Sequence, residues 1–174
     1  MTTWDLTFIQ AIIFDGLFAA ISAIGFAIIS NPPRKALFIA ALLAAVGHGL
    51  RYYLMHDSLF MMNIAAASFC AATSIGLLAI PFAKYIRCPS EIFAFPSLLP
   101  MVPGMFAYNS VIALTKFLQA TDTVASQEYI IAFFRNGVTT VFVMFALVVG
   151  VSIPIFIFHR ESFSVTRLLS LPKK

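Results

Sequence analysis

An acidic residue inside an apolar stretch is the first position in this chain that could do chemistry. Asp15 lies about nine residues, or roughly 14 Å of helix, from the start of the stretch at Leu6. A charged carboxylate at that depth of a bilayer is costly unless it is paired, hydrated or protonated. Two roles follow: a group that gates substrate, couples protons or pairs with a cation, or a structural ion pair with Arg51 or Arg135. The first is favoured because ionisable residues inside a membrane usually serve function.

A histidine and an arginine follow in the next apolar stretch. His48 and Arg51 are three residues apart, so they share nearly the same face of a helix. Gly47 and Gly49 leave room for close approach by a neighbouring helix or a ligand. His48 could relay protons, although a hydrogen-bonded packing role is favoured. Arg51 could hold a carboxylate with both nitrogens or extend to the membrane surface, and Arg135 is expected to extend to the surface in that way.

Prolines interrupt a later apolar stretch. Each proline removes a backbone donor and frees a carbonyl one turn earlier, which a bilayer tolerates only beside protein or a water-filled cavity. A span broken in this way indicates a transporter binding site, because a helix that restarts after the break presents amides to an anionic group. A helix kinked only for packing is the alternative. The residues expected on the substrate path here are Pro100, Pro103, Gly104, Tyr108 and Asn109, with Pro96 and Ser110 beside them.

The sequence contains no recognisable catalytic set. It has no paired-histidine zinc motif, no glycine-rich phosphate loop and no nucleophile elbow. Its two cysteines, Cys70 and Cys88, have neither a metal-ligand spacing nor a disulfide framework. We therefore expect no enzymatic activity, no metal and no cofactor.

The composition identifies the environment of these residues. Of 174 residues, 61% are hydrophobic and 10% are charged, and the mean hydropathy is +0.96. So short a chain cannot bury that much apolar surface in one water-soluble core. Soluble enzymes, nucleic-acid binders and secreted disulfide modules are thereby disfavoured, and the bilayer becomes the expected solvent.

Five apolar runs are long enough to cross a bilayer, which takes about 20 residues each. Continuous runs exclude the short alternating segments of a barrel, so we expect an all-α integral membrane protein with the fourth span broken. The expected bundle covers residues 1–158 and precedes a basic cytoplasmic tail at 159–174. The expected spans are 6–29, 36–55, 59–82, 91–117 and 129–158.

The loops differ in charge between the two sides. With five spans, the loops after the first and third share a side with the C-terminus, and this side carries most of the Lys and Arg residues. The positive-inside rule then places the N-terminus outside and the C-terminus in the cytoplasm. The basic side holds Arg34, Lys35, Lys84, Arg87, Arg160, Arg167, Lys173 and Lys174, and the other holds Asp5, Asp57, Asp122 and Glu128 with Lys116 near it.

Several motifs together resemble a known transporter family. The stretch from Asn31 to Leu37 (NPPRKAL) leads into Gly47–Arg51 (GHGLR), and Pro100–Gly104 (PMVPG) precedes Tyr108. In order and spacing these are similar to the smaller membrane subunit of the split threonine/serine exporter family, from about Ile9 to Arg160. The resemblance also implies an acidic residue where Asp15 stands. Arg135 and the doubled proline depart from the pattern, which leaves the charge of the substrate open.

The resemblance implies a secondary exporter of small hydrophilic metabolites in the bacterial inner membrane, carrying threonine and serine or a dicarboxylate such as succinate. It also implies a larger partner subunit with a soluble N-terminal region and five further helices, and no nucleic acid. Independently, an odd number of spans would insert a preceding five-helix half upside down, as in inverted-repeat transporters. A scaffold subunit that only stabilises a partner, or a small channel or membrane enzyme, are the alternatives.

Overall fold

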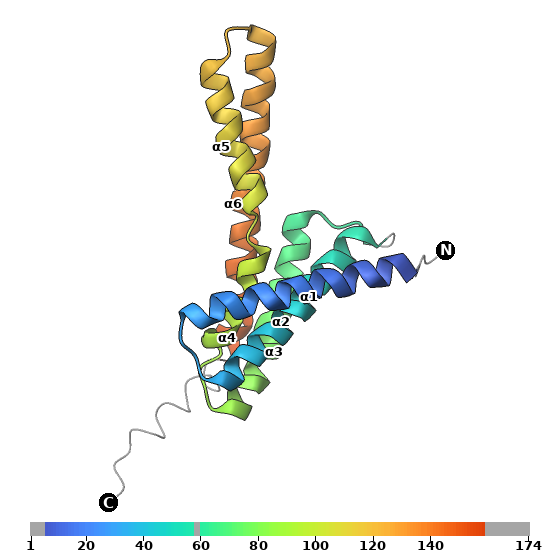
Figure 1. The fold of residues 1–174 in the computed structure, drawn as a ribbon, viewed down its shortest axis with the longest axis vertical. Coiled ribbons are helices and arrows are strands. Elements are labelled where there is room, and N and C mark those ends of the chain that lie inside the picture. Colours follow the sequence, from blue (N-terminus) through green and yellow to red (C-terminus); the bar gives the residue numbers. More distant parts are fainter. Residues whose placement is uncertain (1–5, 58–59, 159–174) are drawn as a thin grey trace, which may run out of the picture. The chain divides into compact units, whose positions relative to one another are not determined.

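The computed structural model describes residues 6–57 and 60–158, and every regular element within those ranges is helical. This confirms the all-α prediction. The predicted tail at 159–174 lies outside the described residues. The elements shown in Figure 1 are α1 (Leu6–Ile29), α2 (Arg34–His56), α3 (Ile64–Ile86), α4 (Glu91–Leu98), the 3-10 turn η1 (Leu99–Met101), α5 (Gly104–Gln119) and α6 (Thr123–Ile157).

Four of the described helices are long and apolar enough to cross a membrane: α1, α2, α3 and α6. A fifth span results if α4, η1 and α5 are counted as one broken crossing. The length and hydropathy of the described helices therefore give four or five candidate spans, and the bent pair lies where the broken fourth span was predicted.

The chain divides into two compact units, and each is described by itself. The first unit comprises residues 1–101 and 146–174, and the second comprises residues 102–145. Helix α6 contributes its N-terminal part to the second unit and its C-terminal part to the first.

In the first unit, α1 and α2 form a tight antiparallel hairpin with α4 against α2. Ala36, Ala40 and Ala44 recur every fourth residue on α2 and are fully buried. Such small residues allow helix backbones to approach closely. Ser97 on α4 uses that closeness, because its hydroxyl oxygen lies 2.9 Å from the carbonyl oxygen of Ala40.

Helix α3 packs on the C-terminal part of α6 through glycines. A β-carbon built on Gly76 would lie 2.8 Å from the carbonyl oxygen of Val151, and one on Gly150 would lie 2.8 Å from that of Phe69. Real β-carbons do not tolerate such distances, so the two backbones touch only because both residues lack a side chain.

Two helices begin at places that differ from the predicted spans. Helix α3 runs from Ile64 to Ile86. It starts at Ile64 because the side chain of Asn63 caps it by accepting a hydrogen bond from the amide of Ala66 at 2.8 Å. Residue 59, the predicted start, lies outside the described residues. Helix α6 starts at Thr123, six residues before the predicted 129, because Asp122 caps it by accepting from the amide of Ala125 at 3.3 Å.

The predicted break in the fourth span is present, although only part of the proline run produces it. Pro96 lies inside α4 and Pro100 lies inside η1. The helix stops after Met101 and restarts at Gly104, with Pro103 immediately before the new helix. A proline fits there because the first residues of a helix need no amide donor.

The second unit is a hairpin of α5 and the N-terminal part of α6. The Ser110 hydroxyl on α5 donates to the carbonyl oxygen of Phe133 on α6 at 3.0 Å. A β-carbon on Gly137 would lie 3.1 Å from that hydroxyl oxygen. This glycine therefore lets the serine hydroxyl reach the backbone of α6.

Candidate functional site

The side chains of Asp15 and His48 are in direct hydrogen-bonding contact within the first unit. Oδ2 of Asp15 on α1 lies 2.5 Å from Nδ1 of His48 on α2. The His48 side chain is 11% exposed and that of Asp15 is 32% exposed. A short carboxylate reaches the imidazole because Gly16 brings the helices together: a β-carbon there would lie 3.0 Å from the carbonyl oxygen of Ala45.

The glycines beside His48 allow the close approach that the sequence suggested. A β-carbon on Gly49 would lie 3.3 Å from the side chain of Ile12 on α1. One on Gly47 would lie 2.5 Å from Ile75 on α3 and 2.8 Å from Met101 of η1. His48 is thus held between three neighbouring elements, with little room for other rotamers.

Arg51 and the second nitrogen of His48 face the broken span. Nη1 of Arg51 donates to the carbonyl oxygen of Met101 at 3.0 Å. Nη2 of Arg51 lies 3.1 Å from Nε2 of His48, and the same Nε2 lies 3.2 Å from the carbonyl oxygen of Pro100. Arg51 therefore has polar partners inside the protein instead of only extending to the membrane surface.

The break in the helix explains why the carbonyl of Pro100 is available. In a continuous α-helix the amide of Gly104 would donate to the carbonyl of Pro100. Here that amide donates to the carbonyl of Val102 at 2.8 Å. The prolines thus leave backbone acceptors at the break, and side chains of α2 take them up.

In this arrangement His48 can gain or lose a proton, and its hydrogen-bond partner changes with that proton. Arg51 only donates and a carbonyl only accepts, so Nε2 of His48 can satisfy one of them at a time. A neutral His48 with its proton on Nδ1 donates to Asp15 and accepts from Arg51. A protonated His48 donates from both nitrogens, to Asp15 and to Pro100. Among the described residues, no three His, Cys, Asp or Glu side chains lie together as a metal site.

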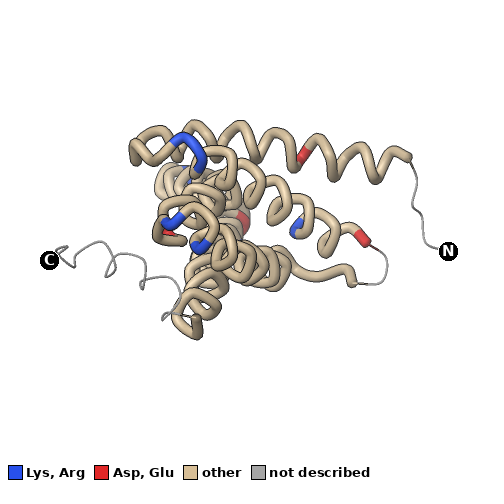
Figure 2. The backbone as a smooth tube through the Cα atoms, turned by 90° about the horizontal axis from the view of Figure 1, so that it is seen from below, with Lys and Arg blue, Asp and Glu red and all other residues tan. Residues whose placement is uncertain are grey.

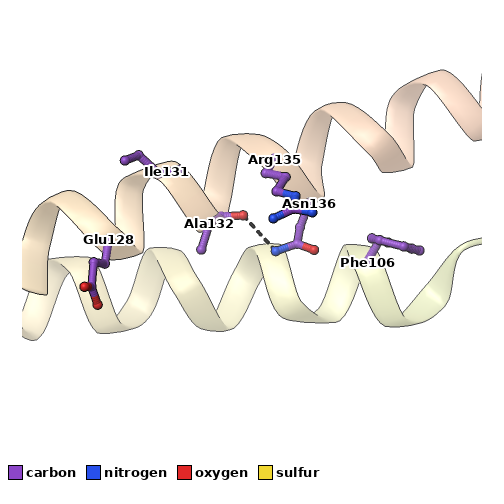
Figure 3. A pocket seen from close by; sticks show the side chains of 6 residues that line it. All are labelled: Phe106, Glu128, Ile131, Ala132, Arg135 and Asn136. Atoms are coloured by element: carbon purple, nitrogen blue, oxygen red, sulfur yellow. Dashed lines mark hydrogen bonds between the residues drawn. The ribbon is translucent and has the colours of Figure 1, made fainter. Parts of the chain in front are cut away.

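A separate hollow lies along the hairpin of the second unit. It has a volume of about 410 Å³, within the usual range of small-molecule sites. Figure 3 shows five of the lining side chains on α6 and one on α5, with Arg135 beside Asn136. The side-chain nitrogen of Asn136 donates to the carbonyl of Ala132 at 2.8 Å. The lining residues are Phe106, Glu128, Ile131, Ala132, Arg135 and Asn136.

The sequence-predicted residues thus fall into two groups. Asp15, His48, Arg51 and Pro100 form one cluster in the first unit. Pro103, Gly104, Tyr108 and Asn109 belong to the second unit. Of these, Gly104 is the first residue of α5, and Tyr108 is 61% exposed on that helix.

Two residues at these sites, one beside Arg51 and one beside the hollow, were not singled out as site residues by the sequence. The carbonyl of Met101 binds Arg51, and its only signal was its position just before the predicted break. Glu128 was assigned to a loop, although it stands seven residues before Arg135 and so shares a face with it once α6 is seen to include both.

A comparison with protein-family models identifies the family. The family model described as "Threonine/Serine exporter, ThrE" matches residues 15–157. An uncharacterized protein of Haemophilus influenzae is 35% identical over 154 residues, which cover 88% of this chain and 50% of that protein. The chain therefore spans about half the length of this curated relative. No solved structure matches.

Proposed function

This chain belongs to the threonine/serine exporter family, and we propose that it forms one membrane half of a secondary exporter of small hydrophilic metabolites. The family is one of transporters and the described helices are apolar enough to cross a bilayer, so the chain is a membrane protein. The substrates proposed for the complete exporter are threonine and serine, or a dicarboxylate such as succinate.

One observation carries the proposal: polar side chains of α1 and α2 converge on the backbone of a broken span. Asp15, His48 and Arg51 all come from helices long enough to cross the membrane, where ionisable groups are costly and mark transport paths. Their hydrogen bonds end on the carbonyls of Pro100 and Met101. Discontinuous helices are the usual place for substrate and ion binding in secondary transporters.

A second membrane half is part of the proposal. The chain spans half the length of its relative, and five crossings would place a preceding five-helix half in inverted orientation. We therefore propose a partner subunit with five helices and a soluble N-terminal region.

We also propose that the complex lies in the bacterial inner membrane with the N-terminus of this chain outside. Figure 2 shows basic positions of the first unit gathered where α1 passes to α2 and α3 passes to α4. Arg34 and Lys35 are the first residues of α2, and Arg87 directly follows α3, which supports a cytoplasmic location of these connections.

The decisive experiment measures export of threonine, serine and succinate from cells that lack their own exporters. Cells expressing this chain with its partner should export at least one of them, and cells with either subunit alone should not. The Asp15→Asn variant should lose most export while the complex still forms, because asparagine keeps the size of the side chain and removes its charge.

A matched control uses the same chemical change outside the cluster. Asp122→Asn lies at the start of α6, where asparagine also caps a helix, so export should stay at the wild-type rate. Unchanged export in Asp15→Asn would favour a scaffold subunit. Loss of the complex in Asp15→Asn would assign the Asp15–His48 pair to assembly, and activity of this chain alone would indicate a channel or enzyme.

A further inference from the structure

We propose that the hollow between Glu128 and Arg135 is a binding subsite for a zwitterionic α-amino acid, and that Glu128 excludes dicarboxylates from it. The inference rests on the proposed exporter function and names the substrate class. It concerns the second unit only and is independent of the Asp15–His48 pair.

The two charged residues lie on one face of α6. Seven residues separate Glu128 from Arg135, which is about two helical turns or roughly 10 Å along the axis. Ala132 lies between them, and its small side chain leaves the hollow open. Both charged side chains are exposed, and both are long enough to turn toward a molecule bound over Ala132 (Figure 3).

The two charges do not neutralise each other. Glu128 and Arg135, both among the described residues, do not come within 4.0 Å of each other as an ion pair. Arg135 nevertheless lies in α6, a helix long and apolar enough to cross a membrane. An arginine there is costly without a partner, and a carboxylate ligand would supply one.

The chemistry of the lining matches an amino acid better than a dicarboxylate. A guanidinium binds a carboxylate with two parallel hydrogen bonds, and the carboxylate of Glu128 accepts hydrogen bonds from an ammonium group. Phe106 and Ile131 supply apolar walls for a small side chain. A dicarboxylate would place its second negative charge toward Glu128, where like charges repel.

The test measures counterflow of labelled threonine into threonine-loaded, right-side-out membrane vesicles that contain the complete exporter. Unlabelled competitors are threonine, succinate, N-acetylthreonine, which lacks the ammonium group, and threonine amide, which lacks the carboxylate. In the wild type, threonine should compete about tenfold better than the other three, because each lacks one charge-assisted contact or adds a repulsion.

The variants should shift this order in opposite directions. Glu128→Gln should make succinate and N-acetylthreonine about tenfold better competitors relative to threonine. Arg135→Gln should make threonine a weaker competitor, so that threonine amide competes as well as threonine does. Glu128→Asp, which keeps the charge, and Glu91→Gln, which makes the same change on α4, should both keep the wild-type order.

The outcomes separate this inference from the proposed function. Wild-type vesicles without counterflow of threonine or succinate would refute the exporter function and the subsite with it. Counterflow with an unchanged competitor order in Glu128→Gln would overturn the subsite alone, as would a wild-type preference for succinate. Rates are normalised to the amount of complex in the membrane, and a Glu128→Gln protein that fails to insert is replaced by Glu128→Ala, which should shift the order in the same direction.

Discussion

Nε2 of His48 lies 3.2 Å from the carbonyl oxygen of Pro100, which links a helix-borne imidazole to the backbone of the broken span. The same nitrogen lies 3.1 Å from Nη2 of Arg51. Because a donor and an acceptor compete for one atom, the protonation of His48 decides whether it binds the break directly or through Arg51. The polar cluster and the backbone of the broken span therefore share one histidine nitrogen.

Arg51→Lys should reduce export by about tenfold even though the charge is kept. A guanidinium reaches His48 and Met101 at once, whereas an ammonium on a flexible chain cannot reproduce that fork. The loss of one hydrogen bond to a charged group accounts for the magnitude. Export assays of Arg51→Lys beside Arg34→Lys, an exposed position at the start of α2, measure the effect. Equal rates in both variants would contradict the role of the fork.

Replacing Pro100 and Pro103 together with alanine should restore a continuous helix and abolish export. The new amide at residue 103 can donate to the carbonyl of Leu99, and the amide of Gly104 can then donate to the carbonyl of residue 100. His48 would lose that acceptor. Hydrogen exchange of the amides between residues 100 and 107 should become slower as the helix closes, while membrane insertion is unchanged. A variant that exports at the wild-type rate with a closed helix would refute the need for the break.

Two glycines should respond differently to the same substitution. A β-carbon on Gly104 meets no atom within 4 Å, whereas one on Gly76 would lie 2.8 Å from the carbonyl oxygen of Val151. Gly104→Ala should therefore leave the melting temperature nearly unchanged, and Gly76→Ala should cost about 1–3 kcal/mol of stability.

The bulkier Gly104→Leu variant then tests the substrate path alone. It should fold normally and block export, because the proposed path is closed by side-chain volume. Thermal unfolding in detergent and export assays on the same variants separate the two effects. Wild-type export in Gly104→Leu would remove this residue from the path.

Cys88 should react slowly with alkylating reagents at neutral pH. It lies between α3 and α4 and is 8% exposed, and burial raises the pKa of its thiol above the ordinary value. Because the thiolate is the reactive form, its alkylation rate should keep rising at pH values where an exposed cysteine has already reached its plateau. The reaction of Cys88 in a Cys70→Ser protein with iodoacetamide, compared with that of a free thiol at the same pH, measures this. Matching pH profiles would contradict the burial effect.

The proposed orientation predicts which loops can be labelled from outside. In a protein with Cys70 and Cys88 replaced by serine, a Thr121→Cys substitution between α5 and α6 should react with a membrane-impermeant reagent on intact cells. Lys35→Cys at the start of α2 should react only after the cells are opened, because the basic loops face the cytoplasm. The reverse pattern would invert the topology.

The sequence by itself determined that the bilayer is the solvent of this protein, that its elements are helices and that its fourth span is broken. A chain with 61% hydrophobic and 10% charged residues has no other place to bury its surface than a bilayer. Two prolines close together, Pro100 and Pro103, remove amide donors that a continuous helix would need there. Helix starts were less well predicted, because the caps Asn63 and Asp122 precede residues whose hydropathy does not separate loop from helix. Their cap-forming side chains were the signal that could have corrected them.

Only the tertiary structure decided which polar groups contact one another. Asp15 was expected to pair with an arginine if it was structural, and it instead contacts His48, 33 residues away in the sequence. Neither hydropathy nor spacing fixes how two helices rotate and cross, and a rotation of one residue moves a side chain by about 100° around the axis. The approach at Gly16 and Ala45 sets that rotation, and with it the reach of α2 to the carbonyls of Pro100 and Met101.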